Sequence, residues 1–201
     1  MAEARFDFKN FVEESKATLL RPVEYFTSMR KEGGLAEPVL KTLIYGLAAG
    51  VLTYLWLLVG LRTPGSMLHG VIGGAGGFLT ILTTPLAAVV TMFLGAVLIL
   101  ALSAVCGGET SFEPCARVAA SLAVLSPLGA ALNLSWALGA TFGGIVDLAV
   151  NVLGIWLWHK AQVHALGGKP NAAKVVAVIL AVLLVLSALA GSRSMRGMTG
   201  V

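Results

Sequence analysis

Residues 79–105 read LTILTTPLAAVVTMFLGAVLILALSAV, a run without a single charged side chain. A helix of about 20 apolar residues is long enough to cross the hydrocarbon core of a bilayer. Four other apolar runs are similar, and together the five runs are residues 39–61, 79–105, 118–138, 141–158 and 174–191. The sequence therefore predicts an all-α fold, a polytopic membrane helix bundle with five transmembrane helices.

The composition of the whole chain agrees with this prediction. Of its 201 residues, 57% are hydrophobic and 12% are charged, whereas soluble domains carry roughly twice that charged fraction. An ordinary soluble enzyme and a disordered tail are thereby excluded, and two cysteines make no disulfide scaffold. The net charge of +4 is distributed between the apolar runs rather than clustered on a soluble module. We therefore expect no nucleic acid among the partners.

The first 38 residues are charged throughout and lack the apolar core of a signal peptide. Phe8, Phe11 and Leu19 recur at helical spacing, which predicts an amphipathic helical segment over 1–38. Such a segment either dips into lipid head groups or docks onto the bundle or onto another protein. The five-span domain then covers 39–191, and a short tail covers 192–201.

The distribution of Lys and Arg predicts the orientation of the spans, because cytoplasmic loops carry an excess of these residues. Eleven basic residues fall on the side of the N-terminus: Arg5, Lys9, Lys16, Arg21, Arg30, Lys31, Lys41, Arg117, Lys160, Lys169 and Lys174. The opposite side has three: Arg62, Arg193 and Arg196. We therefore expect a cytoplasmic N-terminus and an external C-terminus.

Several short motifs occur in a familiar order. Arg21–Phe26 and Gly33–Pro38 lead into the first span, Gly107–Phe112 precedes the third, and Ser126–Pro127 lies inside it. In this order they resemble the Yip1 domain, from about residue 10 to residue 190. The resemblance implies a non-enzymatic role in membrane organisation, trafficking or recruitment of partner membrane proteins. The lipid bilayer, other membrane proteins and a second copy of the chain are then the expected partners.

Eukaryotic members of that family act in vesicle traffic with Rab-type GTPases and carry an Asp-Leu-Tyr-Gly-Pro motif ahead of the first span. This chain has no such motif, so the resemblance does not extend to Rab binding. Its compact sequence is similar to the prokaryotic branch, which implies a prokaryotic cytoplasmic membrane. The N-terminal helices and the inner loops, including Glu109, Glu113 and Arg117, are the expected recognition surface.

Asp147 is an ionisable residue inside the fourth predicted span, where it costs ~2.5–3.5 kcal/mol on insertion scales. Asn151 follows one helical turn later, and Asn133 in the preceding span can face them across a helical hairpin. These residues are either a polar site for a proton, a cation or a lipid head group, or interhelical hydrogen-bonding groups. The first interpretation gives an alternative function, a transport, channel or lipid-handling protein. Ser126 and Pro127 predict a kink in the third span beside this site.

Metal binding and catalysis have little support in the sequence. Cys106, Cys115, His159 and His164 all fall on the predicted inner side and form a candidate zinc set, but Cys-x8-Cys is wider than the spacing of structural zinc sites. We expect reduced thiols and interfacial imidazoles instead. The chain has no His-Glu-x-x-His and no Gly-x-Ser-x-Gly motif. We therefore expect no cofactor and no enzymatic activity.

Overall fold

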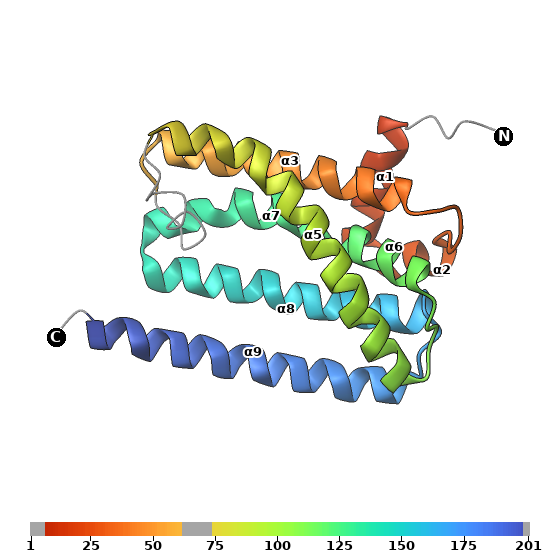
Figure 1. Cartoon of the computed structure of the whole chain (residues 1–201). Helices are drawn as coiled ribbons and strands as arrows, with labels where there is room; N and C mark the ends of the chain where they lie inside the picture. Colours follow the sequence, from red (N-terminus) through yellow and green to blue (C-terminus); the bar gives the residue numbers. More distant parts are fainter. Residues whose placement is uncertain (1–6, 62–73, 199–201) are drawn as a thin grey trace.

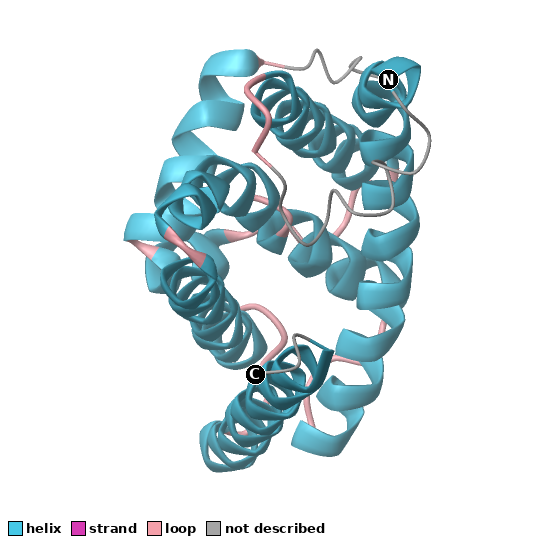
Figure 2. Ribbon diagram, turned by 90° about the vertical axis from the view of Figure 1, so that its left-hand side faces the viewer, coloured by secondary structure: helices cyan, strands magenta, loops and turns pink. Residues whose placement is uncertain are grey.

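Five helices long enough to cross a membrane dominate the computed structural model, which describes residues 7–61 and 74–198 (Figure 1). Four spans are single helices: α3 (Ala36–Leu58), α5 (Gly74–Cys106), α8 (Ala140–His164) and α9 (Pro170–Met198). The third span is divided into α6 (Phe112–Leu122), α7 (Leu125–Leu132) and the 3₁₀ helix η2 (Asn133–Leu138). Two short helices, α1 (Phe8–Leu20) and α2 (Pro22–Ser28), precede them. The described residues contain no strand (Figure 2), so the predicted all-α, five-span fold is confirmed.

The helix boundaries differ from the predicted ones where charged residues belong to a span. The third span begins at Phe112 rather than at 118, because Glu113 and Arg117 form an ion pair one turn apart within α6. The last helix continues to Met198, through most of the predicted tail over 192–201. Residues 1–6, 62–73 and 199–201 lie outside the described residues, as do the predictions that concern Arg5, Arg62 and the chain end.

The spans are arranged so that the two ends of the bundle differ. Figure 1 shows α8 and α9 side by side, α5 crossing them obliquely, and the chain termini at opposite ends. One end carries α1, α2 and the connections from α5 to α6 and from α8 to α9. We call it the polar end. The connection from η2 to α8 lies at the opposite, or far, end.

The first and second membrane helices approach each other closely where one of them carries glycine. A Cβ atom added at Gly46 of α3 would lie 2.6 Å from Cα of Pro85 in α5. One at Gly50 would lie 3.1 Å from the carbonyl oxygen of Thr80. Small residues four apart permit such contact between membrane helices. The α-helix continues through Pro85.

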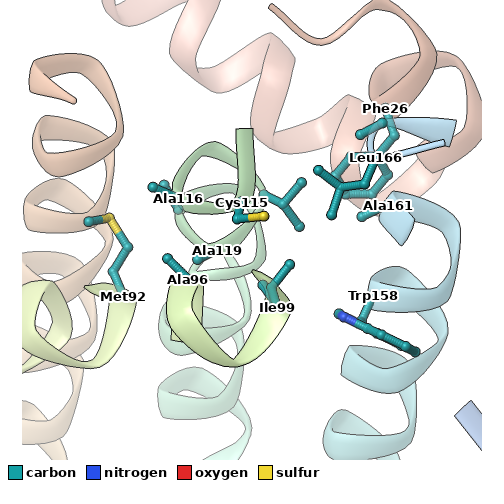
Figure 3. Packing of buried hydrophobic residues seen from close by; sticks show 13 residues of the cluster. Phe26, Met92, Ala96, Ile99, Cys115, Ala116, Ala119, Trp158, Ala161 and Leu166 are labelled. Atoms are coloured by element: carbon teal, nitrogen blue, oxygen red, sulfur yellow. The ribbon is translucent and has the colours of Figure 1, made fainter. Parts of the chain in front are cut away.

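The largest buried hydrophobic cluster joins α2, α5, α6 and α8 (Figure 3). Phe26 is 1% exposed, and Cys115, Ala116 and Ala161 are fully buried. Because the side chains of α6 and α8 are small here, Phe26 of α2 fits among them. The cluster therefore fixes the N-terminal helices to the membrane domain.

A second contact holds α1. The ring of Phe11 lies 4.9 Å from that of Tyr45 in α3, and the hydroxyl groups of Ser15 and Tyr45 are 2.7 Å apart. Phe8 on the same helix is 65% exposed. The structure thus docks α1 onto the bundle, which is one of the arrangements expected for the amphipathic segment.

Two Gly-Gly connections pair with each other at the polar end. Gly107 and Gly167 have φ values of +68° and +67°, a conformation that ends a helix and that glycine adopts without strain. The Glu109 amide donates to the Leu166 carbonyl at 2.6 Å, and the Lys169 amide donates to the Cys106 carbonyl at 2.9 Å. We call residues 107–111 and 165–169 the loop pair. It ties the ends of α5 and α8 together.

Candidate functional site

The predicted intramembrane polar residues line one cavity, which we call the Asp147 cavity. Its volume is about 790 Å³, and its walls come from α3, the third span, α8 and α9. Asp147 and Asn151 of α8 line it, together with Asn133 and Ser126 of the third span. The structure thus brings these four predicted residues around one space.

Within this cavity the Asn151 amide is engaged with its own helix. Its Nδ2 donates to the backbone carbonyl of Asp147 at 2.8 Å. No hydrogen bond or ion pair of the Asp147 carboxylate is found among the described residues. The side chain of Asp147 is exposed and lines the cavity. The structure therefore shows no interhelical hydrogen bond between Asn133 and Asp147.

One face of α8 carries the polar residues that this helix contributes to the cavity. Gly143, Asp147 and Asn151 follow each other at four-residue intervals, so they share a face. The indole ring of Trp136 covers this face at Gly143, where a Cβ atom would lie 2.5 Å from Cδ2 of the ring. Trp136 also lines the cavity. The ring of Trp136 in η2 thus lies against α8 one turn before Asp147.

The third span is interrupted beside this cavity. The α-helical pattern stops at Ala123 and Val124 and resumes at Leu125, next to Ser126 and Pro127. Proline lacks an N–H and its ring clashes with the carbonyl four residues earlier, here that of Ala123. The Ser126 amide donates to that carbonyl instead, at 3.0 Å. Farther along, the indole N–H of Trp56 donates to the Ala130 carbonyl at 2.7 Å, where the α-helix gives way to η2.

A second polar site, the ion-pair cluster, lies at the polar end. Its residues are Glu14, Glu37, Lys41, Glu113 and Arg117. Arg117 is 5% exposed, and its guanidinium group lies 2.9 Å from Glu37 and 3.2 Å from Glu113. It also donates to the Gly34 carbonyl at 3.1 Å. Arg117, which we expected in a recognition loop, is therefore a buried side chain of α6 that pairs with two partly exposed carboxylates.

Lys41 extends the cluster to the N-terminal helix. Its ammonium group pairs with Glu37 at 3.1 Å and also with Glu14 of α1. A cavity of about 190 Å³ lies beside these residues and is also lined by Tyr25 and Ser121, whose hydroxyl groups are 2.7 Å apart. The cluster thus joins α1, α3 and α6.

Glu109 occupies the surface of the loop pair. Its carboxylate accepts hydrogen bonds from the Ser111 hydroxyl at 2.6 Å and from the Ser111 amide at 3.3 Å. These bonds stabilise the charged form and hold the pKa of Glu109 below its usual value. Ser111 precedes the first residue of α6, so Glu109 orders the start of the third span.

The four candidate zinc ligands do not meet in one site. Cys106 and Cys115 are free, buried thiols, and no group of three or more His, Cys, Asp or Glu side chains with metal-binding geometry occurs among the described residues. His159 and His164 belong to the last turns of α8. The thiols instead fill the helix-packing region near the polar end.

Sequence reasoning did not identify most of the ion-pair cluster. Glu37 and Lys41 are spaced as an i,i+4 pair at the start of the first span, and so are Glu113 and Arg117 in the third. That spacing was the available signal. No signal pointed to Gln162, which is fully buried and whose amide atoms have no hydrogen-bond partner among the described residues.

Comparison with known protein families gives one match. The model of the Yip1 domain matches residues 16–191, which include the last five residues of α1, all of α2 and the five spans as far as residue 191 of α9. Neither the curated proteins nor the solved structures gave a match. Because the matched region is most of the chain, this protein belongs to the Yip1 domain family.

Proposed function

We propose that this chain is a non-enzymatic protein that organises the membrane by recruiting other membrane proteins, or further copies of itself, to its polar end. One observation carries the proposal. The helices α1 and α2 are fixed to the bundle at the same end as the loop pair, by Phe26, Phe11 and the ion-pair cluster. A preformed surface pays less ordering entropy when it binds than a disordered tail does. Rab-type GTPases are not among the proposed partners.

The exposed apolar residues of α1 and α2 are the proposed contact points. Phe8, Leu20 and Val23 are 65%, 78% and 41% exposed. Charged side chains surround them, among them Arg21 and Glu24, which form an exposed ion pair. Apolar side chains within a polar rim are typical of protein contact surfaces.

The test replaces these side chains without disturbing the fold. Deleting residues 1–35 would remove Phe26 from the core and Glu14 from the ion-pair cluster, so point variants are sharper. We expect Leu20→Ser with Val23→Ser to reduce the recovery of co-purified membrane proteins. Leu138→Ser, at a residue 75% exposed near the far end, serves as the matched control. Equal recovery with both variants would refute this contact surface.

We further propose that the polar end faces the cytoplasm of a prokaryotic cell and that the C-terminus is external. Basic residues at the polar end support this orientation; they are Lys9, Lys16, Arg21, Arg30, Lys31, Lys41, Arg117, Lys160, Lys169 and Lys174. Single cysteines at Lys31 and Leu138, in a background without Cys106 and Cys115, test it. A membrane-impermeant maleimide added to intact cells should label the Leu138→Cys protein only.

A second candidate function is the handling of lipid, and the Asp147 cavity favours it. The cavity lies among the membrane-spanning helices and combines one carboxylate with apolar walls. This combination suits an amphipathic ligand such as a lipid. Lipid movement between leaflets of proteoliposomes would measure this function, and Asp147→Asn should slow it. An unchanged rate would count against this second function and leave the recruitment proposal intact.

A further inference from the structure

We propose that the Asp147 cavity binds the ammonium head group of an aminophospholipid such as phosphatidylethanolamine, with one acyl chain lying along its apolar wall. The inference deepens the second proposed function by naming the ligand. It concerns binding at equilibrium, so it is measured separately from lipid movement.

The charge of the cavity selects a cation. Among the described residues that line it, Asp147 alone has an ionisable side chain, and no Lys, Arg or His contributes. A carboxylate in a membrane span is costly unless it is paired. No basic group of the described chain contacts Asp147. A cationic ligand would therefore supply the ion pair that the Asp147 carboxylate lacks within the described residues.

The polar neighbours of Asp147 suit a primary ammonium group. Such a group has three N–H donors and no acceptor. The Nδ2 of Asn151 is already used on the Asp147 backbone carbonyl, which leaves its Oδ1 as an acceptor. Asn133 supplies a second amide to the same cavity. One carboxylate and two amides therefore offer an acceptor for each N–H.

The indole ring of Trp136, which lines the cavity, also favours a cationic ligand. Trp136 lies against Gly143, one turn before Asp147 on the same face of α8. Cations are attracted to the face of an indole ring, and aromatic side chains recur in sites for ammonium ligands. A phosphate group, being an anion, would be repelled by the carboxylate of Asp147.

The remaining wall distinguishes a lipid from a metal ion or a proton. Divalent cations are usually bound by several carboxylates, but Asp147 is the one carboxylate among the described residues that line the cavity. Within the described part of the chain, no second carboxylate lines the cavity to relay a proton. Most of the other lining residues are apolar and come from four of the spans; they include Leu125, Val150, Ile155 and Leu180. An acyl chain is the complement of such a surface.

The depth of the site also fits a head group. Asp147 lies seven residues after the start of α8 at Ala140, which corresponds to about 10 Å at the rise of an α-helix. The site is therefore nearer to the far end than to the polar end. A lipid could enter from the leaflet at that end and keep its phosphate close to the interface.

The test measures retained lipid by native mass spectrometry after ejection from nanodiscs of equal parts phosphatidylethanolamine and phosphatidylglycerol. We expect the wild-type protein to retain phosphatidylethanolamine preferentially. Removing one charge-assisted contact should reduce that preference roughly tenfold in Asp147→Asn. Asp147→Glu should preserve it, and Glu24→Gln, at an exposed carboxylate on α2, is the control for loss of charge alone.

A measurement on the wild-type protein keeps the inference falsifiable if the variant folds poorly. Phosphatidylethanolamine and its N-acetyl derivative differ in the ammonium charge, and only the first should compete for the site. Equal retention of both lipids, or an Asp147→Asn protein that folds and retains phosphatidylethanolamine as the wild type does, would overturn the assignment. Selective binding without lipid movement would uphold it and refute the second proposed function.

Discussion

The guanidinium group of Arg117 lies 2.9 Å from the carboxylate of Glu37, so the first turns of the third and first spans are joined by a charge pair at the polar end. Arg117 also pairs with Glu113, whose carboxylate accepts a hydrogen bond from the Gly34 amide at 2.6 Å. The turn between α2 and α3 is thereby held against α6. A single arginine thus links α6 to residues 34–37, which lie 80 or more positions earlier in the sequence.

Replacing Arg117 should therefore destabilise the protein more than replacing an exposed arginine. We expect Arg117→Met to lower the free energy of unfolding by about 1–3 kcal/mol, because it removes the arginine from two carboxylates and leaves Glu37 only Lys41, and Glu113 only the Gly34 amide. The loss stays below that of a fully buried pair, since the side chains of Glu37 and Glu113 are 42% and 31% exposed. Thermal unfolding in detergent measures it. Arg21→Met, which removes a pair that is 74% exposed on both sides, should change stability by less than about 0.5 kcal/mol.

The glycines of the membrane helices should differ sharply in their tolerance of alanine. A Cβ atom at Gly46 would lie 2.6 Å from backbone Cα of Pro85, and the backbone cannot rotate away. Gly46→Ala should separate α3 from α5 and cost about 1–3 kcal/mol. At Gly144 no atom lies within 4 Å of the added methyl group, so Gly144→Ala should be neutral or slightly stabilising. Equal midpoints of thermal unfolding for the two variants would contradict the close packing.

The docking of α1 should depend on Phe11 and not on Phe8. Phe11 is 7% exposed, whereas Phe8 is 65% exposed on the same helix. We expect Phe11→Ala to raise the hydrogen-exchange rates of amides in residues 8–20 by at least about tenfold, which corresponds to a loss of about 1.4 kcal/mol in docking free energy. Phe8→Ala should leave these rates unchanged. If both variants exchanged like the wild type, α1 would be held by the Glu14–Lys41 pair instead.

The sequence was sufficient for the number and approximate positions of the spans, because long uncharged runs have few alternatives to a membrane. It also predicted that Asp147, Asn151 and Asn133 would belong together. The helical interval between Asp147 and Asn151 and the short connection at Gly139 carried that inference. Because this connection is short, the third and fourth spans must lie side by side.

The ion-pair cluster could not be predicted in the same way. A residue such as Arg117 at the edge of an apolar run is usually read as a loop charge that marks topology. Its burial depends on partners that lie 80 positions away at Glu37 and 83 at Gly34. Only the folded arrangement of α3 and α6 brings these groups together. The pairing of the two Gly-Gly connections could not be predicted for the same reason. Each connection, taken alone, indicates only a turn that ends a helix.

The loop pair should control access to a buried thiol. A Cβ atom at Gly108 would lie 2.7 Å from the Ser103 hydroxyl and 2.8 Å from the Leu166 carbonyl, which accepts the Glu109 amide hydrogen bond. Gly108→Ala should therefore push the two loops apart. Cys106, which is 1% exposed and whose carbonyl accepts from Lys169, would then open to reagents.

Labelling by N-ethylmaleimide in a Cys115→Ala background measures this opening. We expect the Gly108→Ala protein to react at least about tenfold faster than its parent, since a local opening made easier by about 1.4 kcal/mol is ten times more populated. Thr110→Ala changes an exposed side chain in the same loop and should react at the parent rate. Equal rates for all three proteins would mean that Cys106 is shielded by the helix packing of α5 alone, and that the hydrogen bonds between the loops do not limit its exposure.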